Sequence, residues 1–472
     1  MWQTLMDVMY KLRNYQEVTI NRIYEQLKLG HRSIMVQQPP RTGKTVIMAE
    51  IARRATRKGN SVLFLVHRKE LVDQARRTFE EQGVDMSLVT MGMVQTMTRH
   101  VGELSEPTII MIDEAHHVLA KSYRRIIDAF PRAVRIMVTA TPWRMNGAGF
   151  EGVADCLIPG QSMGNLIKHG FLAPIRYFRP PDINTAELKT KANGEFDEQS
   201  VAEALKPKIY SNAVKMYLAH ARGMQAIAYA YNVQSAKQLA KNFNDAGISA
   251  AEVDGATPKE ERDRLIQRYR DGKITILTNA ELFTEGLDLP NVDCVIMMRP
   301  TQSLSLYLQF SMRAMNPRAG KTAVIIDHVD NLSRFGLPID ERSWTLKGTQ
   351  TAGRKHGETI TPTTTCPYCF ATFYRKGRKT CPICGRKLTV PDEESGPVHI
   401  DADLVEVSQA KQQAKRRVEI AHMIRDSEMM KWIADKTPDQ LENMIQLQYY
   451  ARLHGYKPGW AYVVGKKRGF VR

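Results

Sequence analysis

Two short stretches of the sequence contain the residue types that bind phosphates and activate water. In the first, an apolar run over 34–36 is followed by Gly43-Lys44-Thr45 and then by a helical pattern. Backbone N–H groups at the start of such a helix form a concavity for anionic oxygens. Lys44 can then reach the β and γ phosphates of a nucleotide, and Thr45 can offer its hydroxyl to Mg²⁺.

The second stretch is an apolar run over 109–112 that ends in Asp113-Glu114. One carboxylate at the end of a buried strand can hold Mg²⁺, which is the role expected of Asp113, and the next can polarise the attacking water, the role expected of Glu114. Together the two stretches indicate a chain that hydrolyses a nucleoside triphosphate, or that descends from one that did.

Four of the six cysteines are clustered late in the chain, which is the usage of a metal site rather than of a disulfide framework. Cys366 and Cys369 form one pair, and Cys381 and Cys384 form a second after eleven intervening residues. Two such pairs predict a closed, structural Zn²⁺ site in a small ribbon, with no open position for catalysis.

The residues between the two cysteine pairs allow two interpretations. They could stack on bases and neutralise phosphates, or they could form the small core of the ribbon with a solvated basic face. The residues in question are Phe370, Phe373, Tyr374, Arg375, Lys376, Arg378 and Lys379.

Length and composition narrow the class of protein. A chain of 472 residues has room for two or three domains, and 43% apolar and 25% charged residues are ordinary for a globular protein. The net charge of +17 favours a polyanionic partner such as nucleic acid, although solubility alone could account for it. The N-terminus lacks the layout of a secretory signal, and no apolar run is long enough to span a membrane. We therefore expect a cytoplasmic protein without a membrane partner, in a bacterial host cell or associated with the nucleoid.

The order of predicted elements gives an α/β fold class. Strands at 61–66, 109–112 and 134–138 alternate with helices, which predicts a doubly wound parallel sheet. A second α/β unit begins at 225, with strands at 226–230, 273–277 and 294–298.

The motif order resembles the first lobe of a superfamily 2 DEAD/DEAH-box helicase. It consists of the phosphate loop, then Asp113-Glu114-Ala115-His116, then Thr139-Ala140-Thr141-Pro142. The phosphate loop has Gln38 where the general pattern has its first glycine, and superfamily 2 helicases commonly lack that glycine. The most similar members are the RadD-like and the phage or prophage DEAH helicases, and the resemblance covers residues 10–345 well.

The resemblance implies two RecA-like parallel-sheet lobes of a P-loop NTPase, followed by a small zinc ribbon and a helical tail. The expected boundaries are 1–150 for lobe 1, 151–224 for a connector with an insertion, 225–346 for lobe 2, 347–365 for a linker, 366–390 for the ribbon and 391–472 for a basic, helical C-terminal region. The expected cofactors are ATP, Mg²⁺ and structural Zn²⁺.

The resemblance also assigns site residues. The catalytic set is Lys44, Asp113, Glu114 and Arg313, with Thr45 and Asp113 on Mg²⁺. The further nucleotide-binding positions are Arg13, Gln16, Arg41, Thr42, Gly43, Asp288 and Gln309. The nucleic-acid positions are His67, Arg68, Gln95, Thr96, Thr284 and Arg299.

The function implied is an ATP-dependent helicase or translocase, phage-encoded and acting in replication, recombination or repair. The expected substrate is single-stranded or forked DNA, tracked in the 3′-to-5′ direction. Replication or repair proteins are expected to bind the C-terminal region.

The last helicase motif departs from the family pattern. Arg313 matches its first arginine, but its second falls on Asn316. A guanidinium from the opposite lobe neutralises charge on the γ-phosphate, and asparagine cannot do this. Three explanations stay open: Arg313 suffices, Arg318 replaces the missing arginine, or the ATPase is slow. In the last case the alternative function is an ATP-gated clamp or remodelling protein that does not separate strands.

Overall fold

The computed structural model divides the chain into two compact units, Met1–Thr389 and Val390–Arg472. It describes residues 10–143, 149–180, 188–191, 194–204, 207–280, 289, 291–347, 363–388, 433, 436–441, 444–454, 456, 459–468 and 470. No helix among these residues has both the length and the apolar character that a membrane crossing needs. The first unit contains both sheets and the clustered cysteines.

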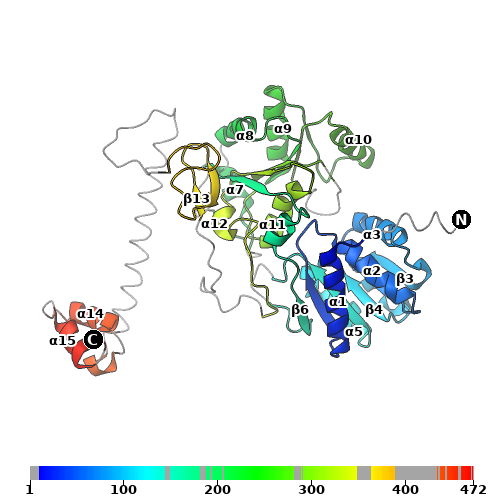
Figure 1. The fold of residues 1–472 in the computed structure, drawn as a ribbon, viewed down its shortest axis with the longest axis horizontal. Coiled ribbons are helices and arrows are strands. Elements are labelled where there is room, and N and C mark those ends of the chain that lie inside the picture. Colours follow the sequence, from blue (N-terminus) through cyan, green and yellow to red (C-terminus); the bar gives the residue numbers. More distant parts are fainter. Residues whose placement is uncertain are drawn as a thin grey trace. The chain divides into compact units, whose positions relative to one another are not determined.

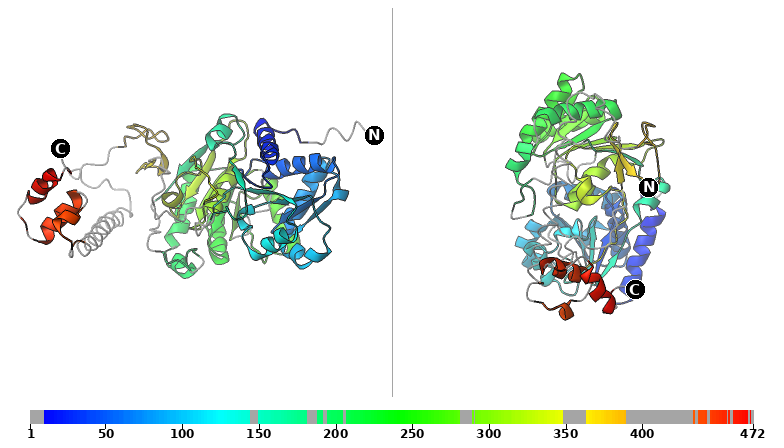
Figure 2. Two further views of the ribbon diagram at one scale, coloured as in Figure 1. Left: turned by 90° about the horizontal axis from the view of Figure 1, so that it is seen from below. Right: turned by 90° about the vertical axis from the view of Figure 1, so that its left-hand side faces the viewer.

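A six-stranded parallel sheet forms lobe 1, coloured blue to cyan in Figures 1 and 2. Its strands in spatial order are β3 (Val89–Met93), β2 (Val62–Val66), β4 (Ile109–Ile112), β5 (Val134–Thr139), β1 (Ser33–Gln37) and β6 (Cys156–Ile158). Its helices are α1 (Asn14–Lys28), α2 (Lys44–Thr56), α3 (Lys69–Glu81), α4 (Val94–Arg99) and α5 (Lys121–Ala129). Because β1 and β4 are parallel members of one sheet, the segments that follow them emerge at the same edge.

Helices cover both faces of this sheet, and the apolar strands are buried on both sides as a result. In β1, Ile34 and Val36 pack in one cluster with residues of α1, α2 and α3, whereas Met35 packs in a second cluster with residues of α5. This alternation follows from the two-residue period of a strand. It explains why β1 and β2 read as continuous apolar runs in the sequence.

An eight-stranded sheet forms the core of lobe 2, coloured green to yellow in Figure 1. In spatial order it contains β13 (Thr363–Thr365), β14 (Ala371–Tyr374), β7 (Ile175–Phe178), β12 (Ala323–Asp327), β11 (Cys294–Met298), β8 (Ala226–Ala230), β10 (Ile276–Asn279) and β9 (Ala250–Glu252). The pairs from β7 to β9 are parallel, and β13 and β14 are antiparallel. The helices are α7 (Glu198–Ala204), α8 (Pro207–His220), α9 (Val233–Asp245), α10 (Lys259–Arg270), α11 (Leu304–Met312) and α12 (Leu332–Phe335).

The connector is shorter than the predicted 151–224. Strand β6 pairs with β1 and so extends lobe 1, whereas β7 pairs with β12 and belongs to lobe 2. Helix α8 also packs into the lobe 2 core. The described segment between the two sheets is 159–174, which contains α6 (Met163–Lys168). The sequence missed this because β6 and β7 are short edge or near-edge strands inside a stretch that lacks a clear pattern.

The end of the predicted lobe 2 returns to lobe 1. Trp143 of lobe 1 donates from Nε1 to the carbonyl of Thr345 over 3.2 Å, and its ring lies 4.6 Å from that of Trp344. The N–H of Phe150 donates to the carbonyl of Leu346 over 2.7 Å. The boundary predicted at 346 therefore lies inside a segment that packs on the first lobe.

The cysteine-containing ribbon is not a separate module joined by a free linker. Strand β13 lies inside the predicted linker 347–365 and pairs with β14, and β14 pairs in turn with β7 of lobe 2. Ala371 and Cys366 are buried in the core of lobe 2. The described part of the ribbon therefore extends the lobe 2 sheet.

The second unit contains a small helical core. The helices are α14 (Met444–Leu453) and α15 (Trp460–Lys467), and the fully buried side chains include Ile433, Leu441 and Leu447. The rings of Tyr456 and Trp460 stack 4.4 Å apart. Residues 391–432 of the predicted helical region lie outside the described residues, and the boundaries 366–390 and 391–472 stay predictions.

Candidate active site

The phosphate loop lies between the end of β1 and the start of α2. Gly43 is the residue before α2 and has a φ of 75°, which favours glycine. A Cβ at this position would also lie 2.5 Å from Nε2 of Gln16, so a side chain does not fit. The backbone can therefore approach an anion closely at the N-terminus of a 13-residue helix.

Gln38 takes a structural role in the loop where the general pattern has glycine. Its side chain is fully buried, and Nε2 donates to Oγ1 of Thr19 over 2.8 Å. The hydroxyl of Thr42 donates to the carbonyl of Pro39 over 2.7 Å, which closes the loop on itself. A Cβ on Gly160, from the connector, would lie 2.5 Å from the carbonyl of Gln37. The connector thus packs directly on the phosphate loop, a contact that the sequence did not signal.

The structure brings Lys44 together with the two carboxylates that follow β4. Nζ of Lys44 lies 2.5 Å from Oε1 of Glu114, and the N–H of Glu114 donates to Oδ1 of Asp113 over 2.9 Å. Glu114 has a φ of 47°, a sparsely populated conformation that redirects the chain at the end of the strand. The predicted catalytic residues of lobe 1 therefore form one cluster.

Burial acts to raise the pKa of Glu114, but neighbouring cationic and hydrogen-bonding groups outweigh it and hold this pKa below its usual range. The largest of these is the ammonium of Lys44, followed by the imidazole of His116, whose Nδ1 lies 3.3 Å from Oε2 of Glu114. Glu114 is therefore an ionised carboxylate at neutral pH, which is the form that can accept a proton.

His116 also links this cluster to the threonines after β5. Its Nδ1 lies 3.4 Å from Oγ1 of Thr139, and that hydroxyl accepts from the N–H of Thr141 over 3.2 Å. A change at Glu114 can thus reach the Thr139-Ala140-Thr141 segment through one imidazole.

Two of the predicted nucleotide-binding residues, Arg13 and Gln16, lie at the start of α1, and the resemblance implies that Gln16 pairs with the edge of the adenine base. Oε1 of Gln16 accepts from the N–H of Arg13 over 2.9 Å, and its Nε2 donates to the carbonyl of Thr42 over 3.0 Å. The hydroxyl of Tyr15 donates to the same carbonyl over 2.8 Å. In this structure the amide of Gln16 therefore joins α1 to the phosphate loop, and base recognition by Gln16 stays a prediction.

A hollow beside this segment contains residues that the sequence did not suggest. It is lined by α1 residues Asn14, Tyr15 and Val18 and by connector residues Gln161, Asn165, Leu166, His169 and Phe171. The ring of Phe171 lies 5.0 Å from that of Tyr15, and the guanidinium of Arg13 lies 5.4 Å above it. An aromatic wall next to Gln16 suits a planar base. Only folding places the connector here, so no sequence signal could have found it.

Lobe 2 contributes Arg313, which lies in a short 3-10 helix directly after α11 and is buried. Gln309 is buried one helical turn earlier. Burial raises the pKa of Tyr229 on β8, and the charges of Arg313 and Arg41 oppose this rise. Arg41 belongs to the phosphate loop and has a φ of 66°. Guanidinium groups from both lobes therefore act on the same tyrosine.

Asn316 and Arg318 lie differently from Arg313. Nδ2 of Asn316 is 3.5 Å from the carbonyl of Leu289, at the limit of a hydrogen bond. Nη2 of Arg318 forms an ion pair of 2.8 Å with Asp293, which Lys321 also contacts at 3.1 Å. Arg318 is thus engaged within its own lobe.

The predicted nucleic-acid residues fall into separate groups. Gln95 and Thr96 are exposed on α4. The ring of His67 lies 5.1 Å from that of His117, which places it beside the Asp113-Glu114 segment, and Arg68 follows at the start of α3.

Of the remaining candidates, the structure describes Arg299, which belongs to lobe 2. Arg299 follows β11, and its carbonyl accepts from Nδ2 of Asn331 over 3.2 Å. Thr284 and Asp288 lie outside the described residues.

The four clustered cysteines have the geometry of a metal site. All four Sγ atoms lie within 4.8 Å of one another, and two pairs, Cys366 with Cys384 and Cys369 with Cys381, are 3.7 Å apart. A tetrahedron with Zn–S bonds of about 2.3 Å has S–S edges of about 3.8 Å, so this donor set fits Zn²⁺. The cysteines form no disulfide.

Two family models match the chain. Residues 208–318 match the helicase conserved C-terminal domain, and residues 9–101 and 87–144 match the res subunit of type III restriction enzymes. The matched segments contain the phosphate loop, the Asp113-Glu114 strand end and Arg313.

Two relatives show how far the similarity extends. A 51.5 kDa protein of a Lactococcus phage is 39% identical over 381 residues, which cover 81% of this chain and 84% of the relative. The Saccharomyces cerevisiae protein IRC3, named as an ATP-dependent helicase, is 28% identical over 64% of this chain. The match covers 49% of IRC3, so this chain spans about half the length of that relative.

Solved structures support the same fold. A fragment described as the HsdR subunit of a type I restriction enzyme from Vibrio vulnificus has a TM-score of 0.56 at 22% identity, covering 71% of this chain and 68% of the fragment. The ATP-dependent type ISP restriction-modification enzyme LlaBIII, solved bound to DNA, has a TM-score of 0.52 at 16% identity. That match covers 67% of this chain and 28% of the enzyme. Both likenesses support two parallel-sheet α/β lobes.

Proposed function

Because the chain belongs to the superfamily 2 helicases and is an ATP-hydrolysing enzyme that acts on nucleic acid, we propose that it is a DNA translocase or helicase in which ATP binds between Lys44 and Arg313. The observation that carries this proposal is the contact between Lys44 and Glu114, which lie in the segments that follow the parallel strands β1 and β4. It places a phosphate-binding cation and an ionised carboxylate in one cluster.

The fit of ATP and Mg²⁺ to lobe 1 rests on shape and charge. Glycine suits position 43 at the start of α2, because its φ is 75° and a Cβ there would meet Gln16, and the helix N-terminus offers N–H groups to an anion. Asp113 is 7% exposed and would hold Mg²⁺ together with the hydroxyl of Thr45. When bound, MgATP supplies the phosphoanhydride bond that is broken.

Three residues of the chain would have separate roles in hydrolysis. Lys44, which now contacts Glu114, would turn to the β and γ phosphates, and this leaves the Glu114 carboxylate to orient water and accept its proton. Arg313 would neutralise charge on the γ-phosphate from the opposite lobe. Because the arginine and the carboxylate belong to different lobes, hydrolysis and lobe closure are coupled.

Lobe closure against a bound strand is the step that would produce movement. The exposed Gln95 and Thr96 on lobe 1 and Arg299 on lobe 2 are our candidates for holding the strand, together with Thr284, which the structure does not describe. The net charge of +17 supports a polyanionic substrate. The similarity to a phage protein and to the fold of a DNA-bound restriction enzyme supports DNA, used in replication, recombination or repair.

A second candidate function is an ATP-gated clamp that binds nucleic acid without separating strands. Asn316 favours it, because the chain offers one arginine where the family pattern has two. The clamp predicts ATP-dependent binding without displacement.

The test compares ATP turnover alone and with single-stranded DNA, duplex DNA or RNA, and then measures displacement from duplexes with a 3′ or a 5′ single-stranded tail. We expect DNA to stimulate turnover and a 3′ tail to support displacement. The matched control is Glu114→Gln, which keeps the shape of the site but lacks a base. Stimulation by RNA alone would overturn the DNA assignment, and tight binding without displacement from either tail would favour the clamp.

The cysteine cluster would hold a structural Zn²⁺. Its closed four-thiolate donor set leaves no position for substrate, so the metal would stabilise the ribbon and not take part in hydrolysis. In the intact protein, zinc content measured by mass spectrometry should be one per chain and should fall when Cys366 is replaced by serine.

A further inference from the structure

We propose that the zinc-binding ribbon carries a second nucleic-acid surface that neutralises the phosphates of a duplex. This surface, the cationic rim, consists of Arg375, Lys376, Arg378, Lys379, Arg386 and Lys387, all exposed. The inference rests on the proposed function, because it adds a contact to the same nucleic acid that the two lobes bind.

Folding joins two basic stretches that are separate in the sequence. The N–H of Cys381 donates to the carbonyl of Arg386, and the N–H of Leu388 donates to the carbonyl of Lys379, both over 2.8 Å. Thr380 pairs with Lys387 in an antiparallel bridge between them. The cations of 375–379 and of 386–387 therefore form one continuous surface.

Within the described residues 363–388, this surface lacks the carboxylates that usually accompany exposed cations. Residues 366–388 contain no Asp or Glu, and none of the six cations forms an ion pair within the described part of the chain. Asp340, which contacts the ribbon, accepts a hydrogen bond from the hydroxyl of Tyr374 and forms no ion pair with these six cations. A zinc ion with four thiolates contributes −2, so the six cations leave this segment at +4. The uncompensated charge suits a polyanion.

The aromatic residues of the ribbon are used for packing rather than for base stacking. Phe370, Phe373 and Tyr374 pack against the core of lobe 2. Tyr368 is exposed, but the guanidinium of Arg386 lies 4.8 Å above its ring. Proteins that bind single strands combine cations with free aromatic faces. Among the described ribbon residues these four rings are each engaged by core packing or by a cation, so the backbone of a duplex is the partner that the cationic rim fits best.

The junction between ribbon and lobe 2 would make this surface move with the lobe. Thr372 of β14 pairs with Tyr177 of β7, and the hydroxyls of Thr365 and Thr372 lie 2.9 Å apart. The N–H of Arg179, directly after β7, donates to the carbonyl of Phe370 over 2.9 Å.

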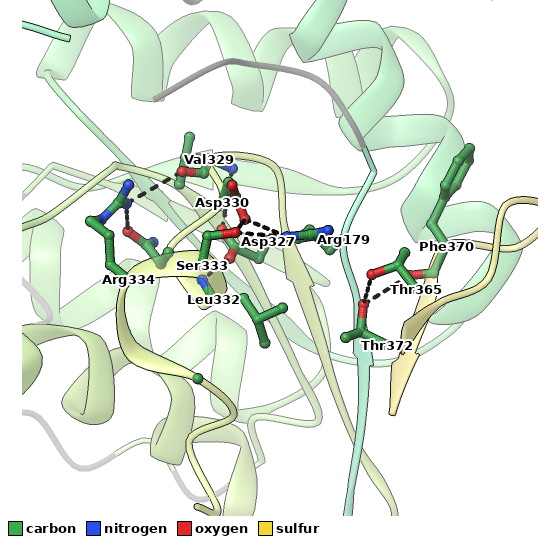
Figure 3. Close-up of polar contacts among 12 residues, drawn as sticks. Arg179, Asp327, Val329, Asp330, Leu332, Ser333, Arg334, Thr365, Phe370 and Thr372 are labelled. Atoms are coloured by element: carbon green, nitrogen blue, oxygen red, sulfur yellow. Dashed lines mark hydrogen bonds and ion pairs between the residues drawn. The ribbon is translucent and has the colours of Figure 1, made fainter. Parts of the chain in front are cut away.

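The side chain of Arg179 then turns to the segment after β12, as Figure 3 shows. Its Nη1 lies 2.9 Å from Oδ1 of Asp330 and 2.8 Å from the hydroxyl of Ser333. A duplex held by the rim would therefore shift together with the lobe that carries Arg313.

The experiment compares the full-length protein with a triple variant that neutralises the rim and a second that removes the same charge elsewhere. The rim variant is Arg375→Gln, Arg378→Gln and Lys379→Gln. The control is Lys259→Gln, Arg264→Gln and Arg268→Gln on α10, where all three cations are also exposed. Anisotropy of a labelled blunt duplex and of a single strand is measured over about 50 to 200 mM salt, the range in which phosphate contacts dominate binding.

We expect duplex affinity of the rim variant to fall at least about tenfold, and the salt slope to decrease by about 0.9 for each phosphate that the variant no longer neutralises. Binding of the single strand should change less. Turnover without nucleic acid and zinc content should match the wild type, which shows that the variant folds.

Equal affinity and slope in the rim variant and the α10 control would overturn the proposal, as would an equal loss for duplex and single strand. If the wild type itself binds no nucleic acid, the proposed function fails first. If the wild type binds and is stimulated normally while the rim variant keeps its duplex affinity, only the rim proposal fails.

Discussion

The two lobes share a parallel-sheet architecture, but the surroundings of Glu50 and Glu114 in lobe 1 differ from those of Asp327 in lobe 2. In lobe 1, Glu50 contacts Arg53 and Arg54 at 2.6 Å, and Glu114 contacts Lys44 at 2.5 Å. In lobe 2, the fully buried Asp327 accepts from the hydroxyl of Tyr177 over 2.7 Å and from the N–H of Leu332 over 3.0 Å.

The pKa values follow this difference. Burial acts to raise the pKa of Glu50, but hydrogen bonds from Arg53, Gln82 and Arg54 lower it to about 2. Burial raises the pKa of Asp327, and hydrogen bonds from neutral donors do not reverse the rise. Glu50 and Glu114 of lobe 1 are thus ionised at neutral pH, whereas burial opposes the ionisation of Asp327 in lobe 2.

The largest effect should come from the cation of lobe 2. We expect Arg313→Ala to lower kcat by about 10³-fold, because removal of an arginine that neutralises γ-phosphate charge has an effect of this order. Steady-state ATP turnover with saturating DNA measures it.

The matched control is Arg318→Ala, which removes a guanidinium that pairs with Asp293 at 2.8 Å within lobe 2. It should change kcat by less than about twofold, as surface ion pairs contribute little. A large loss in Arg318→Ala with little loss in Arg313→Ala would reverse the assignment and show that Arg318 moves to the nucleotide.

The second-largest effect on kcat should come from removing the ammonium of Lys44 in lobe 1. Lys44→Ala should lower kcat by about 10²-fold or more, because it removes a charge that faces the phosphates in the transition state. It should also raise the pKa of Glu114, since Lys44 is the largest influence that lowers it. The acid limb of the pH profile of kcat/KM, which reports the free enzyme, should then move to higher pH. A profile that keeps the wild-type limb would mean that Lys44 does not set the ionisation of Glu114.

The lobe 1 site was largely predictable from sequence, and the reason is local. Gly43 and Lys44 follow one buried strand, and Asp113 and Glu114 follow another. Because parallel strands end at the same edge, strand assignment alone placed these residues together. The connector residue Phe171 was missed, since only the tertiary fold places it 5.0 Å from Tyr15.

The organisation of lobe 2 was less predictable, because its sheet is assembled from distant parts of the chain. Strand β7 was assigned to a connector, and β13 to a linker, yet both belong to the lobe 2 sheet. Short edge strands carry too few residues for a clear period, so their pairing partners decide where they belong. The cysteine spacing predicted a metal-binding ribbon, whereas no sequence feature predicted that β14 pairs with β7 and so joins the ribbon to the lobe 2 sheet.

A stability measurement tests the charge arrangement directly. Glu50→Gln should lower the free energy of unfolding at pH 7 by about 2 kcal/mol, because it removes one partner of a buried charged network. A depressed pKa means that Glu50 stabilises the fold above its ordinary pKa of 4.5, and that this contribution is lost as the pH falls toward 2. The difference between wild type and variant should therefore shrink at pH 3.

Hydrogen exchange followed by peptide mass spectrometry assigns this effect to a lobe. Peptides of α2 and α3 should lose protection in Glu50→Gln, since Gln82 at the end of α3 donates to Glu50 over 3.0 Å. Peptides of β7 and β12 around Asp327 should keep theirs. Equal loss in both lobes would show that the two charge arrangements are not independent.

The smallest expected effect on kcat comes from placing a second guanidinium in lobe 2 at position 316. Nδ2 of Asn316 lies 3.5 Å from the carbonyl of Leu289, at the limit of a hydrogen bond, and the side chain carries no charge. Asn316→Arg should raise kcat up to about tenfold, which corresponds to about 1.4 kcal/mol of transition-state stabilisation. Asn316→Gln, which lengthens the side chain without charge, should leave kcat unchanged. Equal turnover in both variants would mean that Arg313 alone meets the electrostatic demand, because a second charge at 316 would then find nothing left to neutralise.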